Sequence, residues 1–176
     1  SLPAADRYYL EICGANSSAD VYVNGKLAAH HDGGYSTWRV NLTSHLTSHL
    51  SNAASSDQIA ILVDNAPNDR VYPQVADFTF YGGLYRNVNL IAVSNTHFNL
   101  DYFGGTGLQV TPVMDGKNAK VEINGYITNL QENDQIAFRI LDADGEIVAQ
   151  ETGSEAVNPA GTVSSPAASN VTTSNV

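Results

Sequence analysis

The chain has 176 residues, enough for one large domain or two small ones. Hydrophobic residues make up 43% of the sequence, so it can form a packed core and is not a disordered protein. The formal net charge of −10 repels phosphate backbones and anionic lipid, which argues against nucleic acid and membrane surfaces as partners.

Alternation of apolar and polar residues dominates the chain and predicts half-buried β-strands. Between the strands, the Asn24-Gly25 pair predicts a hairpin with a type I′ turn, and the sequence DADG from Asp142 predicts another hairpin. The apolar alternation of Val121, Ile123 and Ile127 continues through Asn124-Gly125, so this pair fits inside a strand. Only residues 42–53 have any helical character, for two turns at most. The predicted strands include residues 8–12, 38–42, 59–63, 121–127 and 136–140.

Residues 76–90, ADFTFYGGLYRNVNL, predict two strands with a break at Gly82-Gly83. Phe78 and Phe80 would share one face of the first strand, and Asp77 and Thr79 the other. We therefore expect Phe78 or Phe80 in a first core. The other expected core residues are Trp38 and Ile61 in the first core, and Val121, Phe138 and Ile140 in the second.

A domain boundary is predicted near Ser94, where a long apolar strand gives way to a polar link rich in Asn, Thr and Gly. A new alternating series begins at Leu108. Residues 151–176 contain no aromatic side chain and predict a flexible tail. Short strands with almost no helix predict an all-β protein of two antiparallel sandwiches.

The cysteine and histidine positions do not form a convincing reactive or metal site. A single cysteine, Cys13, lies in an apolar run and is interpreted as a buried hydrophobe. His45 and His49 are four residues apart, but no further ligand lies near them. His30, His31 and Asp32 are better explained as a polar loop. The Asn-x-Ser/Thr triplets, the first at Asn16, arise by chance in a chain this rich in Asn and Ser.

Asp77 is distinctive among the 18 acidic residues, because most of the others lie in turn sequences and no pair stands out as catalytic. It stands beside Phe78, Phe80 and Tyr81. A carboxylate facing a groove there could accept hydrogen bonds from vicinal hydroxyls, with aromatic faces against the sugar ring. The alternative is a solvated acid at the end of a strand.

The order of motifs resembles the N-terminal sugar-binding jelly-roll domain of glycoside hydrolase family 2, in its β-galactosidase-like members. The resemblance covers about half of the chain, and residues 97–129 also resemble the start of the family's immunoglobulin-like second domain. The matching residues are Val21 to Gly25, His31, Gly33 to Tyr35, Asp64-Asn65, Asp77-Phe78, Gly82 to Arg86, and Val88.

The resemblance implies a jelly-roll (galactose-binding-like) β-sandwich over residues 1–94, with its N-terminal strands missing, followed by an incomplete immunoglobulin-like β-sandwich over residues 95–176. A missing strand would leave a sheet edge uncovered. The family's catalytic (β/α) barrel is absent, and its acid/base and nucleophile glutamates belong to that barrel. No catalytic residue can therefore be assigned in this chain. Asn87 also departs from the aspartate that the family usually has there.

The resemblance implies that Asp77 reaches into the barrel's pocket and contacts substrate hydroxyls, and that in some members it helps to hold a sodium ion. Sodium or magnesium would belong to the full-length enzyme, and no cofactor is expected in this chain. Tyr85 and Arg86 are expected to fasten the strand and the domain interface.

We expect an inactive N-terminal fragment of a retaining β-glycosidase, which acts through a covalent glycosyl-enzyme. The DFTFYGG form favours a β-galactosidase acting on terminal β-D-galactose, with β-glucuronidase or β-mannosidase as further possibilities. The alternatives are a stand-alone carbohydrate-binding module and a purely structural β-region at the interface of a homo-oligomer. The expected partner is a carbohydrate, not nucleic acid or membrane. The sequence predicts no signal peptide, and a bacterial cytoplasmic, periplasmic or secreted location all fit it.

Overall fold

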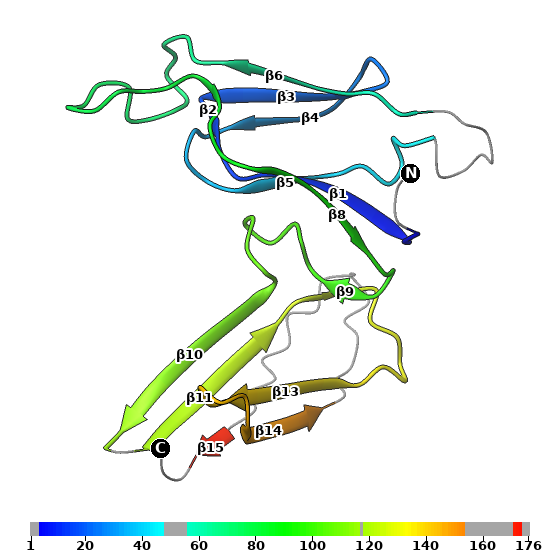
Figure 1. Cartoon of the computed structure of the whole chain (residues 1–176), viewed down its shortest axis with the longest axis vertical. Helices are drawn as coiled ribbons and strands as arrows, with labels where there is room; N and C mark the ends of the chain where they lie inside the picture. The colour runs from blue at the N-terminus through cyan, green and yellow to red at the C-terminus, as the bar shows by residue number, and fades with distance from the viewer. Residues whose placement is uncertain (1–3, 48–55, 117, 154–170, 174–176) are drawn as a thin grey trace. The chain divides into compact units, whose positions relative to one another are not determined.

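The computed structural model describes residues 4–47, 56–116, 118–153 and 171–173. All regular secondary structure in these residues is β-strand, which confirms the predicted all-β sandwich architecture (Figure 1). Within them no helix is long and apolar enough to cross a membrane. The chain divides into two compact units, Ser1–Ser94 and Asn95–Val176.

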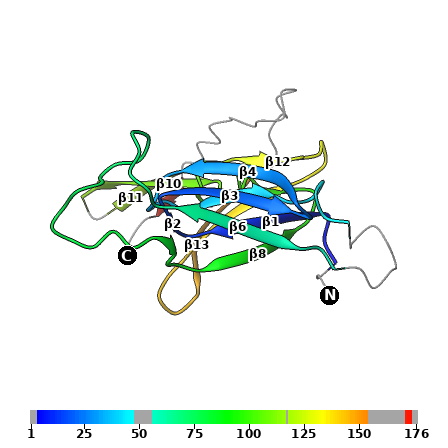
Figure 2. The same cartoon turned by 90° about the horizontal axis from the view of Figure 1, so that it is seen from above.

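The first unit consists of two three-stranded antiparallel sheets and a short two-stranded pair. Its strands are β1 (Arg7–Ile12), β2 (Ala15–Asn16), β3 (Ser18–Val23), β4 (Lys26–Asp32), β5 (Trp38–Asn41), β6 (Ile59–Asp64), β7 (Gly83–Leu84) and β8 (Val88–Val93). One sheet has the order β5-β1-β8 and the other the order β4-β3-β6, while β2 pairs with β7. Figure 2 shows the two larger sheets as layers of this unit.

The core of the first unit lies between the two central strands. Ile12 of β1 is fully buried, as are Val21 and Val23 of β3, because alternate residues of each strand face the opposite sheet. Each such side chain stabilises the fold by roughly 1.5–3 kcal/mol. Trp38 lies in this core, as predicted, and Ile61 is half-buried against it.

The hairpin between β3 and β4 turns at Asn24 and Gly25, with φ of 51° and 77°. Positive φ at both central residues is what a type I′ turn requires. This predicted turn is therefore confirmed. Together with a β-bulge between Val21 and Tyr22, it sets the register that pairs Asp20 with His30 and Ser18 with Asp32.

The first unit has an open side along the edges of β6 and β8, which Figure 2 shows on the same side of the two layers. Leu90 of β8 is 42% exposed, although its partner Leu10 on β1 is only 5% exposed. Val88 and Ile59 are 38% and 37% exposed opposite fully buried partners. Side chains that face the core are thus left partly in water along this side.

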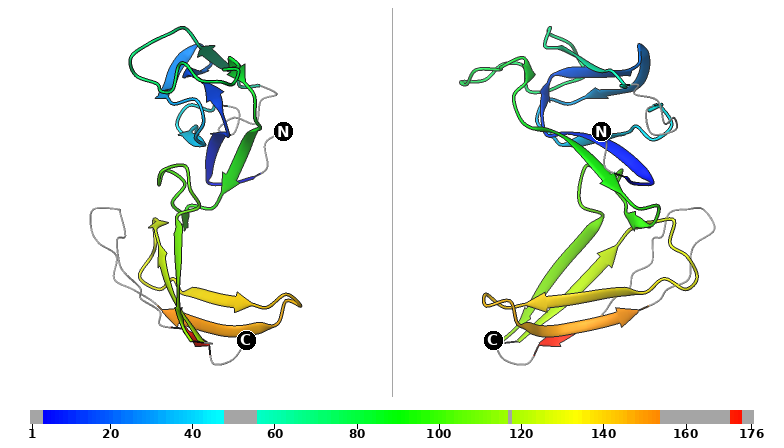
Figure 3. Two further views of the ribbon diagram at one scale, coloured as in Figure 1. Left: turned by 90° about the vertical axis from the view of Figure 1, so that its left-hand side faces the viewer. Right: turned by 45° about the vertical axis from the view of Figure 1, so that its right-hand side comes forward.

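The second unit contains β9 (His97–Phe98), β10 (Leu108–Asp115), β11 (Asn118–Gly125), β12 (Ile127–Thr128), β13 (Ile136–Leu141), β14 (Ile147–Gly153) and β15 (Val171–Thr173). Its sheets are β10-β11-β15, β13-β14 and β12-β9. Figure 3 shows the β13–β14 ribbon crossing the β10–β11 ribbon. Asn124-Gly125 ends β11, and the predicted DADG hairpin joins β13 to β14. The expected core residues Val121, Phe138 and Ile140 are half-buried; Ile123, Ile127 and Leu130 are buried.

Three sequence expectations differ from the structure. Residues 65–82 contain no strand, so the predicted strand through Asp77 is wrong, and Phe78 is exposed rather than in the core. Phe80 is half-buried. Residues 43–45 form a turn, residues 42, 46 and 47 have no regular structure, and residues 48–53 lie outside the described residues. Of the tail, residues 151–153 end β14 and β15 pairs with β11; residues 154–170 and 174–176 lie outside the description.

Candidate functional site

The long connection between β6 and β7, residues 65–82, carries the acid that the sequence singled out. Asp77 is exposed, and it forms no hydrogen bond or ion pair with the other described residues. Four apolar side chains of the same loop are also exposed. These are Tyr72 (73%), Val75 (91%), Phe78 (53%) and Tyr81 (71%). A connection longer than about 15 residues without regular structure is usually either functional or a linker, and its bonds to the body of the unit favour the first. We call residues 65–82 the acidic loop.

Asx-type hydrogen bonds organise the first half of the acidic loop. Asp64 Oδ1 accepts the backbone N–H of Ala66 at 2.8 Å. Asn68 Oδ1 accepts the N–H groups of Arg70 and Val71 at 2.9 and 3.0 Å. The side chain of Val71 is 5% exposed and fixes this turn to the body of the unit. These bonds satisfy backbone donors that a loop without ladder partners would leave unpaired.

Ser17, between β2 and β3, and Asp32 of β4 hold the base of the acidic loop. Arg70 Nε donates to Asp32 Oδ2 at 2.9 Å, and Asn68 Nδ2 donates to Ser17 Oγ at 3.4 Å. Ser17 Oγ in turn donates to the carbonyl of Asp64. A cavity of about 100 Å³ lies at this base; Asn16, Ser17, Asn65, Ala66, Pro67, Val71, Pro73, Gln74 and Phe80 line it.

The carboxylate of Asp32 is the electrostatic centre of this base. Ser18 Oγ donates to it at 2.5 Å, and with His30 and Arg70 this lowers the pKa of Asp32 to about 2. The same network raises the pKa of His30, chiefly through Asp20 at 2.6 Å and also through Asp32. The charged side chains at the base therefore pair with one another, whereas Asp77 has no partner among the described residues.

The far end of the acidic loop is fixed by Asn16, whose Nδ2 donates to the carbonyl of Tyr81 at 2.9 Å. Asn16 is 6% exposed. Next to this bond, Gly82 packs on the amide of Asn65, because a Cβ at Gly82 would lie 2.6 Å from Asn65 Nδ2. The loop therefore returns to β7 through a position that no larger residue fits without moving Asn65.

Tyr85 and Arg86 both reach the connection between β4 and β5. The hydroxyl of Tyr85 donates a short hydrogen bond to the carbonyl of Gly34, and Arg86 Nη1 donates to the carbonyl of Tyr35 at 3.3 Å. The Arg86 guanidinium lies 5.4 Å from the centre of the Tyr85 ring. In this structure the two side chains fasten the segment after β7 to its own unit; their role at a domain interface remains a proposal.

Two of the histidines that the sequence considered as metal ligands, His30 and His31, have other contacts. His30 is paired with Asp20 and Asp32, and His31 stacks on Trp38 with ring centres 4.7 Å apart. Burial lowers the pKa of His31. His49 lies outside the described residues. In the part of the chain that the structure describes, no group of three or more His, Cys, Asp or Glu side chains could hold a metal ion, and Asp77 belongs to no such group.

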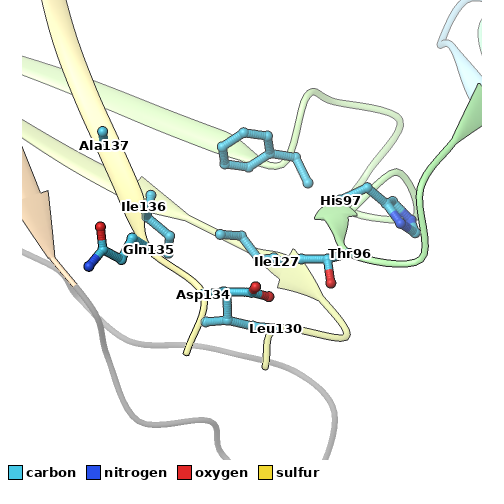
Figure 4. A pocket seen from close by; sticks show the side chains of 9 residues that line it. Thr96, His97, Ile127, Leu130, Asp134, Gln135, Ile136 and Ala137 are labelled. Atoms are coloured by element: carbon cyan, nitrogen blue, oxygen red, sulfur yellow. The ribbon is translucent and has the colours of Figure 1, made fainter. Parts of the chain in front are cut away.

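A groove of about 440 Å³ in the second unit has an apolar floor that includes Ile127 and Leu130 (Figure 4). Two polar groups at its rim, those of Asp134 and Thr96, bond to backbone. Asp134 Oδ2 accepts the N–H of Gln131 at 2.9 Å, and Thr96 Oγ1 donates to the carbonyl of Asn129 at 2.9 Å. These two side chains therefore stabilise turns.

Sequence reasoning missed three side-chain amides of the acidic loop and its base, Asn16, Asn68 and Gln74, and named Asn65 only as a residue of the family resemblance. Asn16 was seen only as the start of a chance Asn-Ser-Ser triplet. A usable signal was present, because the polar run Asn16-Ser17-Ser18 interrupts two apolar strands and all three residues are buried. Buried polar groups need partners, and Asn16 and Ser17 have theirs in Tyr81 and Asn68 of the acidic loop.

No family model matches the chain. A β-glucuronidase of Bacteroides fragilis is 29% identical over 83% of this chain and 21% of its own length. A β-galactosidase of Thermoanaerobacter pseudethanolicus is 26% identical over 80% of this chain and 18% of its own. The solved structure of an FMN-binding β-glucuronidase from Faecalibacterium prausnitzii L2-6 is 39% identical and has a TM-score of 0.77, over 85% of this chain and 23% of that one. The chain thus spans about a fifth of the length of its curated relatives.

Proposed function

The chain belongs to glycoside hydrolase family 2, and from that premise we propose that it forms the N-terminal β-region of a retaining β-glycosidase. The chain's coverage of its relatives supports this, since about four-fifths of their length has no counterpart here. The two carboxyl groups of the hydrolysis would come from that remainder, and this chain would contribute to substrate binding.

The exposed and unpaired carboxylate of Asp77 carries the proposal. A carboxylate without an internal partner can accept charge-assisted hydrogen bonds from two sugar hydroxyls. Tyr72, Val75, Phe78 and Tyr81 expose apolar surface around it. Apolar surface gathered on one loop favours contact with another protein surface or with the face of a sugar ring. The acidic loop would thus dock beside the catalytic pocket, with Asp77 on the substrate; a sodium ion there is only what the family resemblance implies.

We propose a β-D-glucuronide as the substrate of the whole enzyme. The Bacteroides and Faecalibacterium proteins are both β-glucuronidases, and the 39% identity with the latter exceeds the 26% identity with the β-galactosidase. This replaces the preference for a β-galactosidase that rested on the DFTFYGG form. A β-galactoside remains the second candidate, because one relative is a β-galactosidase.

The test is Asp77→Asn in the full-length enzyme, with Asp69→Asn as the matched control. Asp69 is an exposed acid of the same loop. Loss of about 2–4 kcal/mol of transition-state stabilisation predicts that Asp77→Asn lowers kcat/KM by about 30- to 1,000-fold. The melting temperature should not change, because a solvated acid contributes little to folding. Asp69→Asn should behave as wild type.

The measurement is kcat/KM on an aryl β-D-glucuronide and on the matching β-D-galactoside. Faster turnover of the galactoside would reverse the choice of sugar. Wild-type turnover by Asp77→Asn would contradict the role of Asp77. Isothermal titration of the 176-residue chain with methyl β-D-glucuronide and methyl β-D-galactoside tests the stand-alone sugar-binding module. We expect no binding at millimolar concentrations, and a Kd of about 1 mM or below would favour the module.

A further inference from the structure

We infer that Asn16 is a positioning residue that holds the acidic loop in the conformation that presents Asp77. The part of the inference that concerns substrate binding by Asp77 rests on the proposed function. Asn16 is 6% exposed and belongs to β2, whereas the carbonyl it binds belongs to Tyr81 at the far end of the loop. A buried side-chain donor to a loop carbonyl fixes that loop, because breaking the bond would leave a buried polar group unsatisfied.

The surroundings of Asn16 leave its amide little freedom. A Cβ placed at Gly34 would overlap Asn16 Oδ1 and lie 3.1 Å from its Cγ, so the amide lies against the backbone of Gly34. Next to it, β2 and β7 pair Asn16 with Gly83. The amide is therefore held between the Gly34 backbone and the Tyr81 carbonyl, and it can keep both contacts only in this orientation.

Asn16 and Asp77 are linked through a short stretch of chain. Tyr81, whose carbonyl Asn16 holds, lies four residues after Asp77, and the rings of Phe78 and Phe80 between them pack with centres 4.7 Å apart. The Tyr81 side chain is 71% exposed, so the bond from Asn16 fixes the backbone while the ring stays outside. Loss of the bond frees the segment that carries the acid without removing a core side chain.

Chymotrypsin digestion of the native chain tests the hydrogen bond between Asn16 and the Tyr81 carbonyl directly. Cleavage after Tyr81 must draw the Tyr81 carbonyl into the protease, and this is the carbonyl that Asn16 holds. Cleavage after Phe103, which is 90% exposed in the second unit, is the internal reference. We expect Asn16→Ala to raise cleavage after Tyr81, relative to Phe103, by about five- to tenfold. Asn89→Ala, whose amide donates instead to Glu11 Oε1, is the matched control and should leave the ratio unchanged.

Gly34→Ala perturbs the same amide from the other side. Its Cβ would displace Asn16 and should raise the cleavage ratio as Asn16→Ala does. In the double variant, the methyl group added by Gly34→Ala occupies space that the shortened side chain at position 16 has vacated, so Gly34→Ala should add nothing further. An unchanged ratio in Asn16→Ala, or additive effects of the two substitutions, would overturn the inference that Asn16 holds the loop.

The full-length enzyme tests whether holding the loop serves Asp77. We expect Asn16→Ala to lower kcat/KM about tenfold, and to have no further effect when combined with Asp77→Asn. If Asn16→Ala lowered kcat/KM equally in wild type and in Asp77→Asn, Asn16 would act only on stability. That result would overturn the positioning role. Failure of Asp77→Asn alone to lower turnover would instead refute the proposed function, and the cleavage ratio would still decide whether Asn16 holds the loop.

Discussion

Leu10 and Leu90 form a matched pair, and comparing them tests how far the core-facing side chains of β8 are exposed to water. They are cross-strand partners on β1 and β8, so they share the face that packs on the core, yet their exposed fractions are 5% and 42%. Leu→Ala at a buried site loses about 0.8 kcal/mol per methylene and leaves a cavity. We expect Leu10→Ala to lower the free energy of unfolding by about 3–4 kcal/mol, and Leu90→Ala by about 1–1.5 kcal/mol.

Urea unfolding followed by the fluorescence of Trp38 provides the assay. It is the single tryptophan of the chain and is buried in the first unit, so its signal reports that unit alone. Both variants should be compared at concentrations where sedimentation shows a monomer, because an associated copy could cover β8. Equal losses in a monomer would refute the reasoning, since they would mean that Leu90 is as deeply packed as Leu10.

Two further predictions concern the side chains around the acidic loop. Tyr85→Phe removes the hydroxyl that donates to the carbonyl of Gly34 and should lower the free energy of unfolding by about 0.5–1.5 kcal/mol in the same assay; unchanged stability would show that this bond is not formed in solution. The pKa of Asp32, about 2 instead of its usual 3.8, means that its carboxylate stabilises the fold fully above about pH 4 and ceases to do so as the pH falls towards 2. Asp32→Asn should therefore be less stable than wild type at pH 6, with the difference shrinking towards pH 2; a constant difference would contradict the assigned pKa.

The local features of the first unit follow from rules that act over a few residues. Alternation in residues 8–12 and 59–63 predicts strands, because each of these segments has one face that must be buried. The Asn24-Gly25 pair fixes its own turn, since both residues tolerate positive φ. These elements are recognisable in the sequence because the forces that form them act between residues close together in the chain.

The acidic loop shows where such rules stop. The alternation of Asp77 to Phe80 suggests a strand, but a strand needs a neighbour to complete its hydrogen-bond ladder, and residues 65–82 have none in the structure. The sequence alone singled out Asp77 as an unusual acid. That Asp77 is unpaired, and that Asn16 binds the carbonyl of Tyr81 across 65 positions of the chain, depends on folding, because only the packing of β2 beside β7 brings these groups within hydrogen-bonding distance.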